Sequence, residues 1–123
     1  MPERYSDTSI RKKTEDKVLN SLMDGYLDHL IVEKGLSDNT VTAYSRDLII
    51  YIKYLEKRGL SGISGLRLDE TLSFAENLTK TRSPSSAARI LSAIKGFHRY
   101  VYREGELKRL DIEEISAPRA ASR

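Results

Sequence analysis

Two stretches of the sequence repeat cationic and hydroxyl side chains at the spacing of a single helix face. Projected at about 100° per residue, residues 39–57 and 85–103 each place one such set opposite their apolar positions. Neither set contains an aspartate or glutamate, since Asp47 and Glu56 project elsewhere. The first set is Asn39, Thr42, Arg46, Lys53 and Lys57; the second is Ser85, Arg89, Ser92, Gly96, Arg99 and Arg103, with Lys95 at its margin.

Side chains of these types suit the chemistry of nucleic acid. Arginine and lysine attract phosphate, and serine, threonine and asparagine donate hydrogen bonds to phosphates or base edges without bulk. Ordinary solvated helix faces also carry cations, but they usually mix both signs. Gly96 on the second face sacrifices about 1 kcal/mol of helix propensity, which close approach of a DNA backbone or tight helix packing would explain. From the residues alone, a DNA-binding domain and an ordinary helical domain both remain open.

Other kinds of chemistry have no motif in this chain. The two histidines, His29 and His98, are far apart in sequence, and we interpret each as structural. Cysteine is absent, and there is no glycine-rich phosphate loop, HExxH or GxSxG. Asp69 and Glu70 suit the first turn of a helix, where the helix dipole favours negative charge. We therefore predict no catalytic residue, no metal site and no cofactor.

Four amphipathic helices are expected to position the two polar faces. Ser37 and Ser83 are suitable N-caps, and Pro84 suits a first helical position. The apolar periods predict an all-α domain with four principal helices around one core and room for a short fifth around 111–115. The expected spans are 19–35, 38–58, 69–79 and 84–103, and in the third we expect Leu72, Ala75 and Leu78 to point inward.

Length and composition fit one domain. The 123 residues are 39% hydrophobic and 32% charged, with a net charge of +3. No apolar run approaches the roughly 18–20 residues that span a bilayer, and residues 1–7 lack the apolar stretch of a secretory signal. We expect a cytoplasmic protein with a flexible arm at 1–17, a folded domain at 18–116 and the start of a linker at 117–123.

Two blocks carry a resemblance to a known family. Residues 26–59 fit the pattern apolar-x-x-Glu-Lys-Gly-apolar-Ser-x-x-Thr-apolar-x-x-Tyr-x-x-Asp-apolar, from Glu33 to Leu48. Residues 83–105 fit Ser-x-x-Arg-x-Leu-Ser-Ala-apolar-(Lys or Arg)-x-Phe-(Phe, Tyr or His)-x-Tyr, from Ser86 to Tyr100. These blocks resemble the core-binding, SAM-like N-terminal domain of Xer-like tyrosine recombinases and phage integrases. The family's Asn-Pro near the exit is replaced here by Asp111-Ile112.

The resemblance implies a four-helix domain that forms half of a clamp around double-stranded DNA. Its second and fourth helices would face the DNA, and other recombinase protomers would be partners on DNA, whereas the isolated chain is expected to be monomeric. Strand cleavage would belong to a separate C-terminal domain with a nucleophilic tyrosine, so this chain alone is not expected to be an enzyme. The candidate DNA contacts are Asn39, Thr40, Thr42, Arg46, Lys53, Lys57, Ser85, Ser86, Arg89, Ser92, Lys95, Arg99 and Arg103.

Further expectations concern individual surfaces. Arg89 is predicted to contact DNA without affecting stability. The apolar positions Leu19, Leu22, Met23, Leu30 and Ile31 exceed what one docking face requires, so they form either a protomer interface or core. Ile50 and Tyr54 lie away from the core stripe and could pack on the first helix or meet a protomer. The alternative function is a helical protein-interaction module or a stand-alone regulator with the same fold.

Overall fold

The computed structural model describes residues 16–112. Within them the chain forms four α-helices and one 3₁₀ turn, which confirms the predicted all-α class, and none of these helices is long and apolar enough to cross a membrane. The elements are α2 (Lys17–Val32), α3 (Asp38–Lys57), η1 (Gly62–Gly65), α4 (Leu68–Thr81) and α5 (Pro84–Arg103). The expected arm as far as residue 15, most of the short fifth helix and the linker lie outside the described residues.

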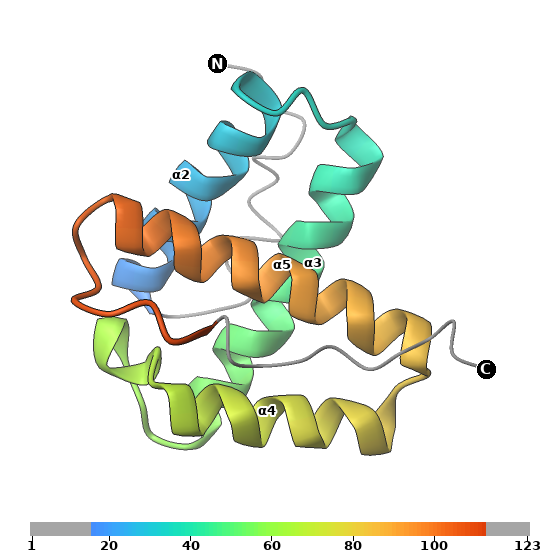
Figure 1. Cartoon of the computed structure of the whole chain (residues 1–123), viewed down its shortest axis with the longest axis vertical. Coiled ribbons are helices and arrows are strands. Elements are labelled where there is room, and N and C mark those ends of the chain that lie inside the picture. The colour runs from blue at the N-terminus through green and yellow to red at the C-terminus, as the bar shows by residue number, and fades with distance from the viewer. Residues whose placement is uncertain (1–15, 113–123) are drawn as a thin grey trace.

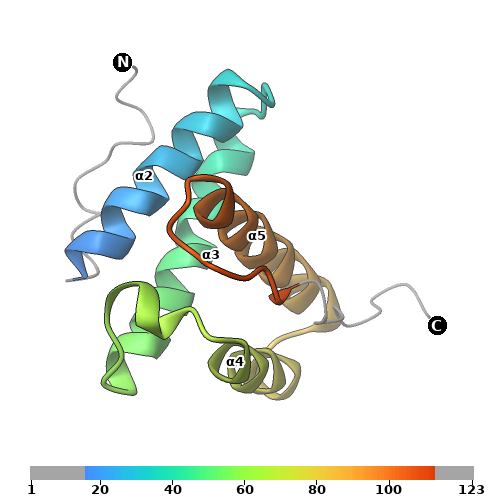
Figure 2. The same cartoon turned by 60° about the vertical axis from the view of Figure 1, so that its left-hand side comes forward.

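Helix α5 crosses α3 at the centre of the fold (Figure 1). Helix α2 packs on both of them toward one end, and α4 packs on both at the opposite end (Figure 2). The core between the helices is apolar, and its largest fully buried side chains include Tyr51, Phe74, Phe97 and Leu19. Ile112 at the end of the described chain joins the same core. The apolar positions that the helical period predicts for α5 are all buried: Ala87, Ile90, Leu91, Ile94, Phe97 and Val101.

The ends of the helices follow local sequence signals. The hydroxyl oxygens of Ser37 and Ser83 accept hydrogen bonds from backbone N–H groups three residues on, at 3.2 and 3.3 Å. Helix α3 is followed by Gly59 at φ 77°, a left-handed conformation in which glycine carries no steric penalty. Helix α2 begins at Lys17, two residues before the expected start, because the carboxylate of Asp16 accepts from the N–H of Leu19 at 3.0 Å.

Helix α4 is rotated relative to the sequence prediction. Leu72 was expected to point inward, but it is 43% exposed, whereas Thr71, Phe74 and Leu78 are buried. The prediction was wrong for Leu72 alone, since Leu78 is buried and Ala75 packs partly buried against the core as expected. Phe74 supplies the large apolar side chain that this helix buries, and its ring packs on those of Tyr51 and Tyr54 at centroid distances of 5.1 and 5.0 Å.

A buried chain of hydrogen bonds joins α3, α4 and α5. The hydroxyl of Tyr51 lies 2.8 Å from the hydroxyl of Thr71 and 2.8 Å from Nε2 of His98. His98 is only 4% exposed, and burial lowers its pKa to about 4, so the ring is neutral at pH 7. This environment agrees with the structural role predicted for His98, and Tyr51, Thr71 and His98 each find a hydrogen-bond partner.

Glycines let α2 and α5 approach closely. A Cβ atom at Gly96 of α5 would overlap the hydroxyl of Tyr26 on α2, and a Cβ atom at Gly25 would overlap the hydroxyl of Tyr100. The two contacts are reciprocal, since each helix provides one glycine and one tyrosine. Of the two explanations offered by the sequence for Gly96, tight helix packing is therefore the one that the structure supports.

Two other groups of apolar residues, whose role the sequence left open, pack within the domain. On α2, Leu19, Met23 and Leu30 are buried and the other two candidate interface residues pack partly buried against the core. The choice between interface and core is thus decided for core. Ile50 and Tyr54 are partly buried against the core, and Tyr54 packs edge-on against Phe74 of α4.

Candidate nucleic-acid interface

The polar face of α5 lies on the surface as predicted. The twenty residues of this helix contain no aspartate or glutamate. Its face is exposed at Ser85, Arg89, Ser92, Arg99 and Arg103, and half-buried at Ser86, Lys95 and Gly96. A helix surface of this composition attracts anions along its whole length.

The predicted residues of α3 divide into two groups. Asn39 and Arg46 are exposed, and between them Thr40 and Thr42 are half-buried; the Thr40 hydroxyl also accepts a hydrogen bond from Ser37 at 3.0 Å. Lys53 and Lys57 are exposed too, but they line a groove of about 500 Å³ together with Phe74 and Asn77 of α4. The structure therefore separates Lys53 and Lys57, which border α4, from the four predicted residues in the first half of α3.

Arg89 is bound to a buried carboxylate on α3. Its Nε and one terminal nitrogen donate to the two oxygens of Asp47 at 3.0 and 2.9 Å. The side chain of Asp47 is 2% exposed and that of Arg89 is 49% exposed. The hydrogen bonds and charge of Asp47 raise the pKa of Arg89. The expectation that removal of Arg89 leaves stability unchanged is thus wrong, because Asp47 would lose its counter-ion inside the protein.

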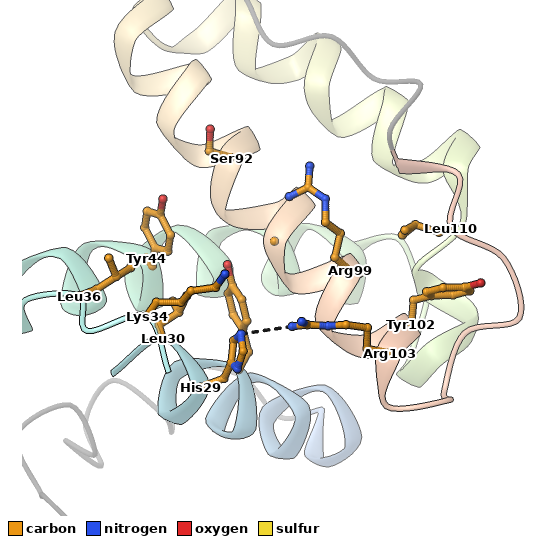
Figure 3. Close-up of a pocket in the computed structure, with 12 residues that line it drawn as sticks. His29, Leu30, Lys34, Leu36, Tyr44, Ser92, Arg99, Tyr102, Arg103 and Leu110 are labelled. Carbon is orange, nitrogen blue, oxygen red and sulfur yellow. Dashed lines mark hydrogen bonds between the residues drawn. The ribbon is translucent and has the colours of Figure 1, made fainter. Parts of the chain in front are cut away.

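A cleft of about 590 Å³ opens where α2, the start of α3 and α5 meet (Figure 3). Four residues of the predicted α5 face, Ser92, Gly96, Arg99 and Arg103, line it. Sequence reasoning did not assign the other polar residues to a site, because they come from α2, the turn after it and the apolar side of α3. These further lining residues include His29, Lys34 and Tyr44. The only signal for them was that Lys34 and Tyr44 fall on the first motif block.

Within the cleft, one terminal nitrogen of Arg103 lies 3.2 Å from Nε2 of His29 (Figure 3). Because arginine is always a donor, Nε2 of His29 accepts this hydrogen bond. The ring of His29 also packs against Tyr100, with 5.9 Å between the centroids. The contact fixes the direction of the guanidinium without neutralising its charge.

The fold and its surface define a small all-α domain with a cationic, acid-free helix face. The chain belongs to the family described as the phage integrase N-terminal SAM-like domain, whose model matches residues 23–105. This membership confirms the resemblance found in the two sequence blocks. No solved structure gives a significant match.

Curated relatives are tyrosine recombinases. The tyrosine recombinase XerD of Mycobacterium tuberculosis is 37% identical over 115 residues, covering 87% of this chain and 37% of the relative. XerD of Listeria innocua is 34% identical over 84% of this chain and 35% of its own, and XerC of Pseudomonas putida is 33% identical over 82% and 34%. The chain therefore spans about a third of the length of these relatives.

Proposed function

We propose that this chain is a DNA-binding domain of a tyrosine recombinase, acting in the cytoplasm and gripping duplex DNA with α3 and α5. The observation that carries the proposal is the polar face of α5, which presents cations and hydroxyls on a helix without a single acid. Family membership and the names of the curated relatives support it. DNA carries a negative charge about every 1.7 Å along its axis, and such a face complements it.

Within this proposal, the residues divide by role. The first turns of α5 present Ser85 and Ser92, which are small enough to let the helix approach a groove and donate to base edges or phosphates. Arg46, Lys95, Arg99 and Arg103 contact phosphates. Arg89 contributes less charge than a solvated arginine because Asp47 already neutralises it.

Strand cleavage and joining are proposed to belong to other parts of the recombinase. The matched region is only about a third of the curated relatives, so most of their length lies elsewhere. Further protomers are the proposed protein partners once the domain is on DNA.

The exposed apolar side chains favour DNA over protein as the ligand of this surface. In residues 16–112 the large exposed hydrophobics are Val18, Val32, Leu72 and Tyr102, from three different helices. Val18 and Val32 alone lie about 21 Å apart, since they are separated by fourteen residues of helix. A protein-docking face usually has a contiguous apolar centre, so the alternative of a protein-interaction module gains no support.

A duplex titrated with the chain at several salt concentrations tests the proposal. If about four cations contact phosphates, log K falls against log salt with a slope of about −4, and Arg46→Gln or Arg99→Gln makes the slope shallower by about 1. The matched control is Lys80→Gln, which removes an exposed cation from the last turn of α4 and should leave the slope unchanged. Absence of binding at low salt, or binding that is independent of salt, would overturn the proposal.

A further inference from the structure

We propose that the cleft between α2, α3 and α5 is a phosphate-binding subsite held by Lys34, Arg99 and Arg103. Its volume of about 590 Å³ lies in the range of small-ligand sites. In Figure 3, Lys34 extends into the cleft from the turn after α2, and Arg99 and Arg103 extend into it from α5. The hydroxyls of Ser92 and Tyr44 border the same space and can donate further hydrogen bonds.

Among the described residues, the lining of the cleft carries cations and no carboxylate. Arg103 differs from several other arginines, because its hydrogen-bond partner in the cleft is the imidazole of His29 and not a carboxylate. The arginines bound to carboxylates elsewhere are Arg58, Arg67, Arg89 and Arg109. Arg103 is thus oriented by the protein while its full positive charge stays available to an anion.

The donor set points to phosphate as the ligand chemistry. A phosphate group has oxygens on several sides, so cations that reach it from two directions can each bind a different oxygen. Leu30, Leu36 and the buried Tyr26 form apolar parts of the wall, and the lower polarity there strengthens the attraction between charges. The phosphate is either a backbone group of nucleic acid or part of a free phosphate compound. In the first case, which rests on the proposed function, α2 and its following turn join the DNA interface.

His29 is a positioning residue in this subsite, since it acts through Arg103. His29→Gln retains an acceptor for the guanidinium, whereas His29→Leu removes it. Phosphate binding is therefore expected to survive in the glutamine variant and to weaken in the leucine variant. A merely structural role for the ring, through its packing on Tyr100, would not produce this order.

The first arm of the test uses inorganic phosphate and the 123-residue chain, followed by NMR at constant ionic strength. Saturable shifts are expected at the amides of Ser92, Gly96 and Arg99, and Arg103→Gln should weaken binding about tenfold. Lys80→Gln is the matched control and should bind as the wild type does. Circular dichroism verifies that each variant is folded; if Arg103→Gln is not, Lys34→Gln on the exposed turn takes its place.

The second arm repeats the duplex titration with Lys34→Gln and Arg103→Gln. A backbone phosphate in the cleft makes the salt slope shallower by about 1 for each variant. Saturable phosphate binding with unchanged slopes supports the subsite and identifies its ligand as a free phosphate compound. The subsite proposal is overturned if the NMR shifts do not saturate with phosphate and both variants keep the wild-type salt slope. This holds even if the chain binds the duplex. Failure of the duplex to bind removes the proposed function, and the inorganic phosphate arm then decides the subsite by itself.

Discussion

Removal of Arg89 is expected to destabilise the fold because it strands a buried charge. Two hydrogen bonds of 2.9 and 3.0 Å join this guanidinium to Asp47, whose side chain is 2% exposed. Opposite charges about 4 Å apart attract by about 4 kcal/mol at an effective dielectric constant of about 20. Arg89 is half exposed and loses little hydration, and ordering its side chain offsets up to about 2 kcal/mol. Arg89→Ala should therefore lower the free energy of unfolding by about 2–4 kcal/mol.

Urea denaturation followed by circular dichroism at pH 7 measures this loss. The double variant Arg89→Ala/Asp47→Asn removes the stranded charge and should recover at least half of the stability. Asp47→Asn alone should cost less than Arg89→Ala, since the half-exposed arginine can be rehydrated. If Arg89→Ala does not fold, Arg89→Lys retains the charge without the paired geometry and should lie between it and the wild type. An Arg89→Ala protein within about 0.5 kcal/mol of wild type, or a double variant no more stable than the single, would refute the reasoning.

Two further predictions concern buried contacts. The pKa of His98 falls from 6.5 to about 4 on folding, so the unfolded chain binds more protons in this window, and stability should drop by up to about 3 kcal/mol as pH falls from 6.5 to 4. Urea unfolding across that pH range should show a shallower fall for His98→Gln, and identical profiles would contradict the prediction. Gly96→Ala should cost about 1–3 kcal/mol despite better helix propensity, because its Cβ meets the hydroxyl of Tyr26. Tyr26→Phe in the same chain should recover part of this loss in thermal unfolding, and a stabilised Gly96→Ala protein would argue against the close contact.

The sequence predicted α3 and α5 well because their signals are local. An N-cap serine, the proline after Ser83 and the glycines that follow each helix act over a few residues, and the apolar period of each helix is strong. The polar face of α5 could be predicted equally well, because it lies opposite the apolar stripe that packs on the core. The exposure of its cations needed no knowledge of the other helices.

What escaped prediction depends on contacts between helices. Asp47 and Thr71 belong to polar residue types, and their burial depends on contacts between helices: Asp47 pairs with the guanidinium of Arg89, and Thr71 bonds to the hydroxyl of Tyr51. The hydrogen bond between the hydroxyls of Thr71 and Tyr51 also sets the rotation of α4 about its axis, which leaves Leu72 exposed. The cleft could not be predicted from the sequence either, because Lys34 and Arg103 are distant along the chain. They line the same cleft only because α2 packs on α5.

The contacts of α5 with α2, α3 and α4 reduce the conformational entropy that this helix can lose when a ligand binds. Its side chains reach α2 through the paired glycines and tyrosines, α3 through Asp47, and α3 and α4 through the bonds of Tyr51. A slide or rotation of this helix would break contacts on several sides at once. The exposed face of α5 is therefore held in one orientation before any ligand arrives, and binding need not restrict a helix that was already immobile. A preorganised surface of this kind retains more of its contact energy as affinity, and the ordering cost is confined to the long side chains themselves.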